Sequence, residues 1–236
     1  MSESSDPAEL VEEDQRSISE ITAIPQLVRI KKKRPPALFP LQKRFRRWQK
    51  YIEISDAGSI ARRAFANNSF DGVLTMVGVV MGSFAVGIQD EAIVLVTGLS
   101  TAMAIGISGG WGAYLTESAE RRHDIAELER ITLSDLQDTQ IGKASRAAVV
   151  LVTAVDGLSP FMAAAIVVVP FLFVPLFPSI TYAFYASLGI ALVALFGLGN
   201  YLGNISKENT LVYGLKTAVA GVACMALTLL IERLTR

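Results

Sequence analysis

The sequence has a single cysteine, Cys224, and a single histidine, His123, among its 236 residues. One cysteine excludes an internal disulfide framework, and its apolar neighbours indicate a packed, unreactive thiol. One histidine excludes a histidine-rich metal site within one chain. Charge is scarce as well, because Asp, Glu, Lys and Arg make up only 19% of the residues, whereas soluble domains contain about a quarter. This composition argues against an ordinary soluble domain.

The residues that are abundant form long apolar runs. Hydrophobic residues make up 51% of the chain, and the mean hydropathy is +0.42. A run of about 18 or more apolar residues is long enough to cross the hydrocarbon core of a bilayer as a helix. We therefore predict an all-α integral membrane protein with five transmembrane helices, at residues 71–88, 92–115, 147–170, 178–199 and 212–232.

The distribution of basic residues predicts the orientation of the chain. Residues 1–70 contain 13 of the 22 lysines and arginines, and the segment 116–146 is the next richest. The short turns after the first and third spans contain none. Because cytoplasmic segments are enriched in Lys and Arg, the N-terminus is predicted to be cytoplasmic and, after five spans, the C-terminus outside.

Three segments are expected along the chain. Residues 1–35 are polar and predict a largely disordered cytoplasmic tail. Residues 36–64 place apolar side chains at helical spacing among lysines and arginines, which predicts a basic amphipathic helix. This helix either contacts anionic lipid headgroups at the membrane surface or packs on the protein's own cytoplasmic face, and no nucleic-acid partner is expected. Residues 65–236 form the five-helix domain, with a short cytoplasmic helical loop at about 116–146.

Four segments resemble successive spans of one known family. They are "NNSFDGVLTMVGVVMG" (67–82), "ISGGWGAYLTESAERR" (107–122), "AAAIVVVPFLF" (163–173) and "YGLKTAVAGVACMALTLLIERL" (213–234). In this order they resemble the vacuolar iron transporter family, which also has five spans. The resemblance implies a dimer that moves ferrous iron, and often manganese, out of the cytosol in exchange for protons along a pathway between subunits.

Asp71 is the first candidate metal ligand, because it is the only charged residue between Arg63 and Asp90. The resemblance implies that it faces the pathway and binds metal and protons. A carboxylate is a hard oxygen ligand for a divalent ion, and an ionisable residue inside a span is usually functional. The alternative is that Asp71 caps the N-terminus of the first span.

The rest of the first span offers one further ligand and a contact surface. Met76 has a soft thioether that either faces the pathway or packs among helices. Gly78 and Gly82 form a G-x-x-x-G pattern, which permits close approach of helices. Together with the resemblance, this pattern predicts a homodimer through the first span.

The second span keeps some of the family's polar residues and lacks others. Ser108 and Tyr114 match the family pattern. Gly109 stands where members commonly have a metal-binding methionine, and Ala113 stands where they often have a glutamate. Ser108 therefore remains a candidate for the metal pathway, and the identity of the ion is left open.

Asp156 is a second acid within an apolar run, "LVTAVDGLSPFMAAAIV". Pro160 removes the helical hydrogen bond to the carbonyl of Asp156, and a freed carbonyl beside a carboxylate can coordinate a cation. The case for this site rests on burial. The alternative is a neutral carboxylic acid that is hydrogen-bonded to a neighbouring helix.

The loop at 116–146 contains further possible ligands. Acidic residues and the histidine fall on one helical face, which allows a mixed nitrogen–oxygen metal site. The alternative is a solvated helix extension that carries ordinary ion pairs. Ser134 is predicted to cap a second short helix before the third span. The candidate ligands in this loop are Glu117, Glu120, His123 and Glu127.

These observations predict a proton-coupled transporter that moves a divalent metal, iron or manganese, out of the cytosol. The alternatives are the same fold carrying another solute or acting as a channel, and a non-transporting membrane scaffold. An enzyme is not expected, because no span has a nucleophile–base pair or a catalytic metal motif, and no cofactor is expected beyond the transported ion. The protein would reside in the cell membrane of a prokaryote or in a vacuolar-type membrane of a eukaryote.

Overall fold

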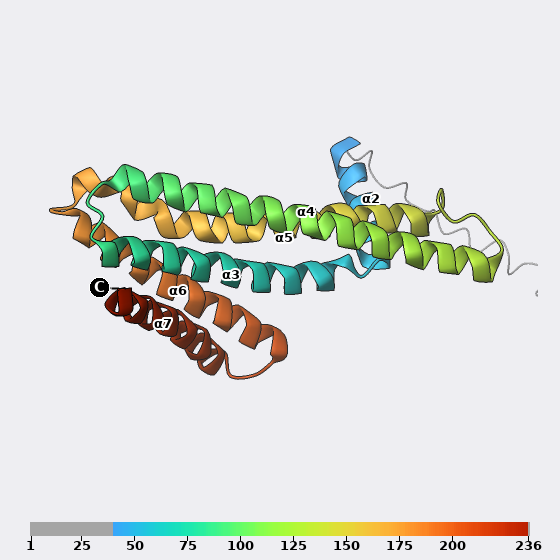
Figure 1. Ribbon diagram of the computed structural model, residues 1–236. Helices are drawn as coiled ribbons and strands as arrows, with labels where there is room; N and C mark the ends of the chain where they lie inside the picture. The colour runs from blue at the N-terminus through green and yellow to red at the C-terminus, as the bar shows by residue number, and fades with distance from the viewer. Residues whose placement is uncertain (1–39, 236) are drawn as a thin grey trace, which may run out of the picture. The chain divides into compact units, whose positions relative to one another are not determined.

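The computed structural model describes residues 40–235, and these residues form helices without any strand (Figure 1). Five of the helices are long and apolar enough to cross a membrane, which confirms the predicted all-α fold with five spans. The predicted tail at 1–35 lies outside the described residues. The helices are α2 (Pro40–Ile54), α3 (Ala57–Val86), α4 (Glu91–Thr132), α5 (Gln140–Val168), the 3-10 helix η2 (Val169–Leu176), α6 (Ile180–Ser206) and α7 (Thr210–Thr235).

The compact unit from Arg44 onward contains all five spans, and the description below concerns this unit. Helix α3 contacts α4 and α5 as well as α6 and α7. The most extensive contacts are those of α4 with α5, α3 with α5, and α6 with α7, and these pairs lie side by side in Figure 1. Helix α3 therefore joins two groups of helices: α4 and α5 in one group, α6 and α7 in the other.

The helices extend beyond the spans predicted from hydropathy. Helix α3 begins at Ala57, directly after Asp56, whose left-handed backbone (φ 50°) separates it from α2. Helix α4 continues without a break to Thr132. The extra length is charged, so the hydropathy of the sequence marks where the membrane ends and does not mark where the helix ends.

The segment between α4 and α5 corrects one prediction. No second short helix follows Ser134: residues 133–139 form a turn. The Ser134 hydroxyl donates to the Thr132 carbonyl at 3.1 Å, which ties it back to the end of α4. Helix α5 is instead capped by Thr139, whose hydroxyl oxygen accepts from Gly142 N at 3.4 Å. The local capping pattern was assigned to the wrong residue.

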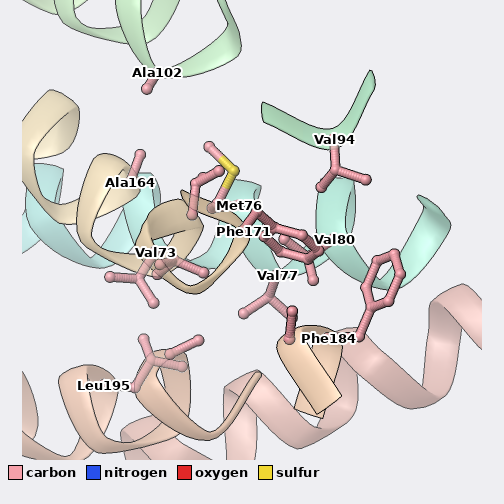
Figure 2. Close-up of a cluster of buried hydrophobic side chains, with 14 of the residues drawn as sticks. Val73, Met76, Val77, Val80, Val94, Ala102, Ala164, Phe171, Phe184 and Leu195 are labelled. Carbon is pink, nitrogen blue, oxygen red and sulfur yellow. The ribbon is translucent and has the colours of Figure 1, made fainter. Parts of the chain in front are cut away.

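A cluster of buried apolar side chains joins α3 to its neighbours (Figure 2). Its largest fully buried members include Met76, Phe171 and Leu195, from α3, η2 and α6. Because lipid is as apolar as these side chains, their contribution to stability comes mainly from close van der Waals packing. The buried cluster members on α3 all follow Asp71, so the second half of this helix packs in the cluster. The first half of α3 makes other contacts.

Candidate metal site between helices 3, 4 and 5

The backbones of α3 and α4 both approach α5 around Pro160. A Cβ atom at Gly72 of α3 would lie 2.4 Å from the Pro160 carbonyl oxygen. A Cβ atom at Gly109 of α4 would lie 2.8 Å from the Asp156 carbonyl oxygen. Only glycine permits such contacts. The carbonyl that Pro160 leaves without a helical donor therefore faces the α4 backbone at Gly109.

The side chain of Asp156 is half-buried and is fixed by a residue of α3. The Asn68 amide nitrogen, Nδ2, donates to Asp156 Oδ1 at 2.8 Å, which joins residues 88 positions apart in the sequence. Asp156 lies ten residues beyond Arg146, the last charged residue before it, or about 15 Å along the helix at 1.5 Å per residue. This hydrogen bond positions one oxygen of a carboxylate well inside an apolar helix.

Asp156 opens onto a cavity of about 310 Å³ between α3, α4 and α5. Glu117 lines the same cavity and is close enough to Asp156 for their charges to interact. One oxygen of Glu117, Oε1, also accepts from Arg121 Nε at 2.8 Å, which makes an ion pair within α4. The lining consists of Ile60, Arg63, Ala64, Asn67, Ala113, Thr116, Glu117, Val152 and Asp156.

The cavity lining presents oxygen donors. Two carboxylates, the Asn67 amide and the Thr116 hydroxyl come from three different helices, and no lining residue has a sulfur or an imidazole. Hard divalent cations prefer such ligands. Arg63, on the charged segment of α3, contributes the basic side chain of this lining. The oxygen ligands of the lining therefore suit a hard cation.

Asp71 lies on α3, three residues after Asn68. It is exposed, midway along a 30-residue helix that begins at Ala57, so the alternative of an N-terminal cap is wrong. Asp71 does not line the cavity of Asp156. Positions 71, 75, 78 and 82 recur at helical spacing on one face of α3. A Cβ atom at Gly78 or Gly82 would meet no atom within 4 Å, so this face of the protomer is open.

The remaining predicted ligands are not gathered at the cavity. Met76 is fully buried in the apolar cluster of Figure 2, where packing accounts for its position. Ser108 is exposed on α4. Glu120, His123 and Glu127 are exposed on the extension of α4, and residues 46–235 contain no group of three Asp, Glu, His or Cys side chains suited to hold a metal ion. The structure does not bring these residues together at one site, so their roles as metal ligands remain predictions.

Sequence reasoning missed the uncharged polar members of the site. Asn68 positions Asp156, and Asn67 and Thr116 line the cavity. The signal was the polar doublet Asn67-Asn68 at the head of an apolar run. Its meaning depends on which helix packs against it, and hydropathy alone does not provide that information.

Comparisons with known proteins identify the family. A model of the VIT family matches residues 63–160, a segment that holds all of the cavity lining except Ile60. An uncharacterized protein of Methanocaldococcus jannaschii is 32% identical over 179 residues, which cover 75% of this chain and 91% of that protein. The chain belongs to the VIT family. Membership in the VIT family indicates a multi-pass membrane transporter of metal ions or other ions.

This VIT family member has its acids in a different arrangement from the family pattern described above. Ala113, at the position where a glutamate is common, lines the cavity. Glu117 lies one turn farther along α4, and Asp156 faces the cavity from α5. Gly109, at the position of the common methionine, packs on the backbone of α5 and leaves no room for a side chain. The cavity therefore keeps carboxylates and has no thioether.

Proposed function

We propose that this protein exports a divalent metal ion from the cytosol in exchange for protons, and that Mn²⁺ is its preferred substrate ahead of Fe²⁺. The observation that carries the proposal is the cavity in which Asp156, Glu117 and Asn67 meet from α5, α4 and α3. Family membership supports metal transport. The all-oxygen donor set favours manganese, because carboxylates and carbonyl oxygens suit Mn²⁺ better than they suit softer ions.

Asp156 is the central ligand in this proposal. Its carboxylate binds the ion in a site of low dielectric, where a charge without a counter-charge is costly. When the ion leaves, a proton takes its place and the carboxylate becomes neutral. Asn68 holds the carboxylate in position by its hydrogen bond. Glu117 adds a second negative charge, which Arg121 partly offsets.

A second copy of the chain would account for the exposed position of Asp71. Asp71 lies eight residues beyond Arg63, or about 12 Å along α3 at 1.5 Å per residue. Hydrocarbon cannot solvate a carboxylate there, so the face that carries it is expected to meet protein or water. Gly78 and Gly82, open on the same face, permit close helix approach. We therefore propose a homodimer through α3, in which the two Asp71 side chains border the pathway between subunits.

The location of the N-terminal helix belongs to this proposal as well. Helix α2 contains three arginines and two lysines, and its Trp48 is exposed. A basic helix of this kind suits the cytoplasmic membrane surface, where anionic headgroups attract it. The protein would then work in a cell membrane or a vacuolar-type membrane, with its N-terminus in the cytosol.

Metal uptake into proteoliposomes with an imposed pH gradient tests the proposal. Mn²⁺, Fe²⁺, Co²⁺ and Zn²⁺ should be compared one at a time, and Mn²⁺ flux should be fastest and should increase with the gradient. Asp90→Asn is a matched control, since Asp90 caps α4 at the far end of the spans and asparagine caps equally well. Metal flux that does not depend on the pH gradient would indicate a channel. Absence of metal flux would indicate a transporter of another solute or a non-transporting scaffold.

A further inference from the structure

A second, larger cavity lies between α4 and α5 at the level where both helices become charged. Its volume is about 760 Å³. Helix α4 has no charged residue from Ala92 to Thr116, and α5 has none from Ala147 to Val155. The cavity includes Tyr114 on the uncharged side of this boundary and Arg121 on the charged side. In a bilayer this boundary corresponds to the level of the lipid headgroups.

The charged half of the cavity is basic. Arg121, Arg122 and Arg146 line it together with one acid, Glu129. Glu129 is already hydrogen-bonded, because its Oε1 accepts from the backbone nitrogen of Leu136 at 2.9 Å. This bond stabilises the turn between α4 and α5.

Two of the three arginines are available to a ligand. Arg146 Nη2 donates to the Gln137 carbonyl oxygen at 2.7 Å, which fixes the side chain without neutralising it. Within residues 46–235, neither Arg122 nor Arg146 has a carboxylate at ion-pair distance. Two guanidinium groups without a counter-charge form a site for a phosphate group, which they bind through paired hydrogen bonds.

The other half of the cavity is apolar. Val149 and Val150 line it from α5, and the ring of Tyr114 lines it from α4. A soluble phosphate compound gains nothing from such a surface, whereas a lipid places its phosphate beside basic residues and its acyl chains against apolar ones. We propose that this cavity binds one anionic phospholipid, with its phosphate on Arg122 and Arg146 and its acyl chains along Val149 and Val150. This site is separate from the cavity of Asp156 and does not depend on which ion is transported.

Binding of short-chain lipids to the purified full-length protein in detergent tests this proposal. Dioctanoyl phosphatidylglycerol should raise the thermal unfolding temperature in a saturable way, while dioctanoyl phosphatidylcholine and inorganic phosphate at the same concentrations should not. Arg122→Gln should weaken phosphatidylglycerol binding at least about tenfold, or about 1.4 kcal/mol. Arg122 is exposed, and within the described part of the chain its side chain has no hydrogen bond or ion pair to lose, so the variant should fold.

Arg130→Gln is the matched control, because Arg130 is also exposed on α4 and lies outside the cavity lining. It should bind phosphatidylglycerol like the unmodified protein. Equal binding of the two lipids would overturn the proposal, since the headgroup would then not matter. A response to inorganic phosphate as strong as that to phosphatidylglycerol would overturn it in favour of a free-anion site. Equal losses of phosphatidylglycerol binding in Arg122→Gln and Arg130→Gln would also overturn it, because general surface charge would then account for the binding.

Discussion

Helices α4 and α5 pack through glycines, and so do α6 and α7, yet the two acids described above as lining a cavity, Glu117 and Asp156, belong to the first pair. A Cβ atom at Gly106 of α4 would lie 2.9 Å from the Gly157 carbonyl oxygen, and one at Gly199 of α6 would lie 2.5 Å from the Tyr213 carbonyl oxygen. Close glycine contacts are therefore a general means of packing helices in this protein. They do not by themselves mark a functional site.

The polar groups of the two regions differ in what they bind. In α6 and α7 two hydroxyls bond to the backbone of another helix: the Thr217 hydroxyl donates to the Leu195 carbonyl at 2.8 Å, and the Ser187 hydroxyl donates to the Val167 carbonyl at 2.6 Å. In α5 the carboxylate of Asp156 is held by a side chain and faces a cavity. Under the proposed function, α6 and α7 do structural work, and the region of α3, α4 and α5 binds the ion. Variants in the two regions should therefore fail in different ways.

The largest effect is expected from Asp156→Asn. The change keeps the volume and an oxygen that can accept from Asn68, so the fold should survive. The neutral amide cannot balance a divalent charge in a site of low dielectric. Mn²⁺ flux in proteoliposomes should fall at least about 100-fold, which corresponds to about 2.7 kcal/mol. A variant that is monodisperse and retains most of its flux would remove Asp156 from the ion pathway.

Asp71→Asn should have a smaller effect on flux. Asp71 borders the proposed pathway between protomers and is not part of the Asp156 cavity. Its loss removes charge along the route and leaves the central site intact, so Mn²⁺ flux should fall about tenfold, or about 1.4 kcal/mol. Asp90→Asn, measured in parallel, should be unchanged. Normal flux through Asp71→Asn would show that the exposed acid lies off the route.

Leucine at Gly78 or Gly82 should affect assembly more than folding. A Cβ atom at either position meets nothing within 4 Å in one protomer, so the protomer should remain folded. The proposed dimer would lose its close approach of helices, and the fraction of dimer in mild detergent should drop several-fold by cross-linking or light scattering. Gly189→Leu on α6, equally open in one protomer, is the matched control. An unmodified protein that is monomeric in several mild detergents would contradict the dimer.

The smallest effect is expected in the second region. Thr217→Val removes the hydroxyl that bonds to Leu195, which should cost about 1 kcal/mol of stability. Thermal unfolding in detergent should shift down by a few degrees. Mn²⁺ flux per folded molecule should not change. A loss of flux comparable to that of Asp156→Asn, in a protein that is still folded, would break the division between the two regions.

The sequence predicted the spans better than it predicted the site. Apolar runs identify five helices because hydrocarbon demands length and low charge. Asp156 was predicted for the same reason, as an acid inside such a run. Its partner Asn68 was not predicted, because that contact joins residues 88 positions apart and depends on how α3 packs on α5. Met76 illustrates the opposite case: a plausible ligand by residue type, which the fold places in the apolar core.

The most direct test of the central claim is whether Mn²⁺ and protons move in opposite directions through the site of Asp156. Proteoliposomes that enclose a pH-sensitive dye should receive external Mn²⁺ in the absence of any imposed pH gradient. With the unmodified protein, Mn²⁺ entry should acidify the outside and make the interior more alkaline, and Asp156→Asn should abolish both movements while Thr217→Val preserves both. Mn²⁺ entry without any proton movement, or normal exchange through Asp156→Asn, would contradict the account.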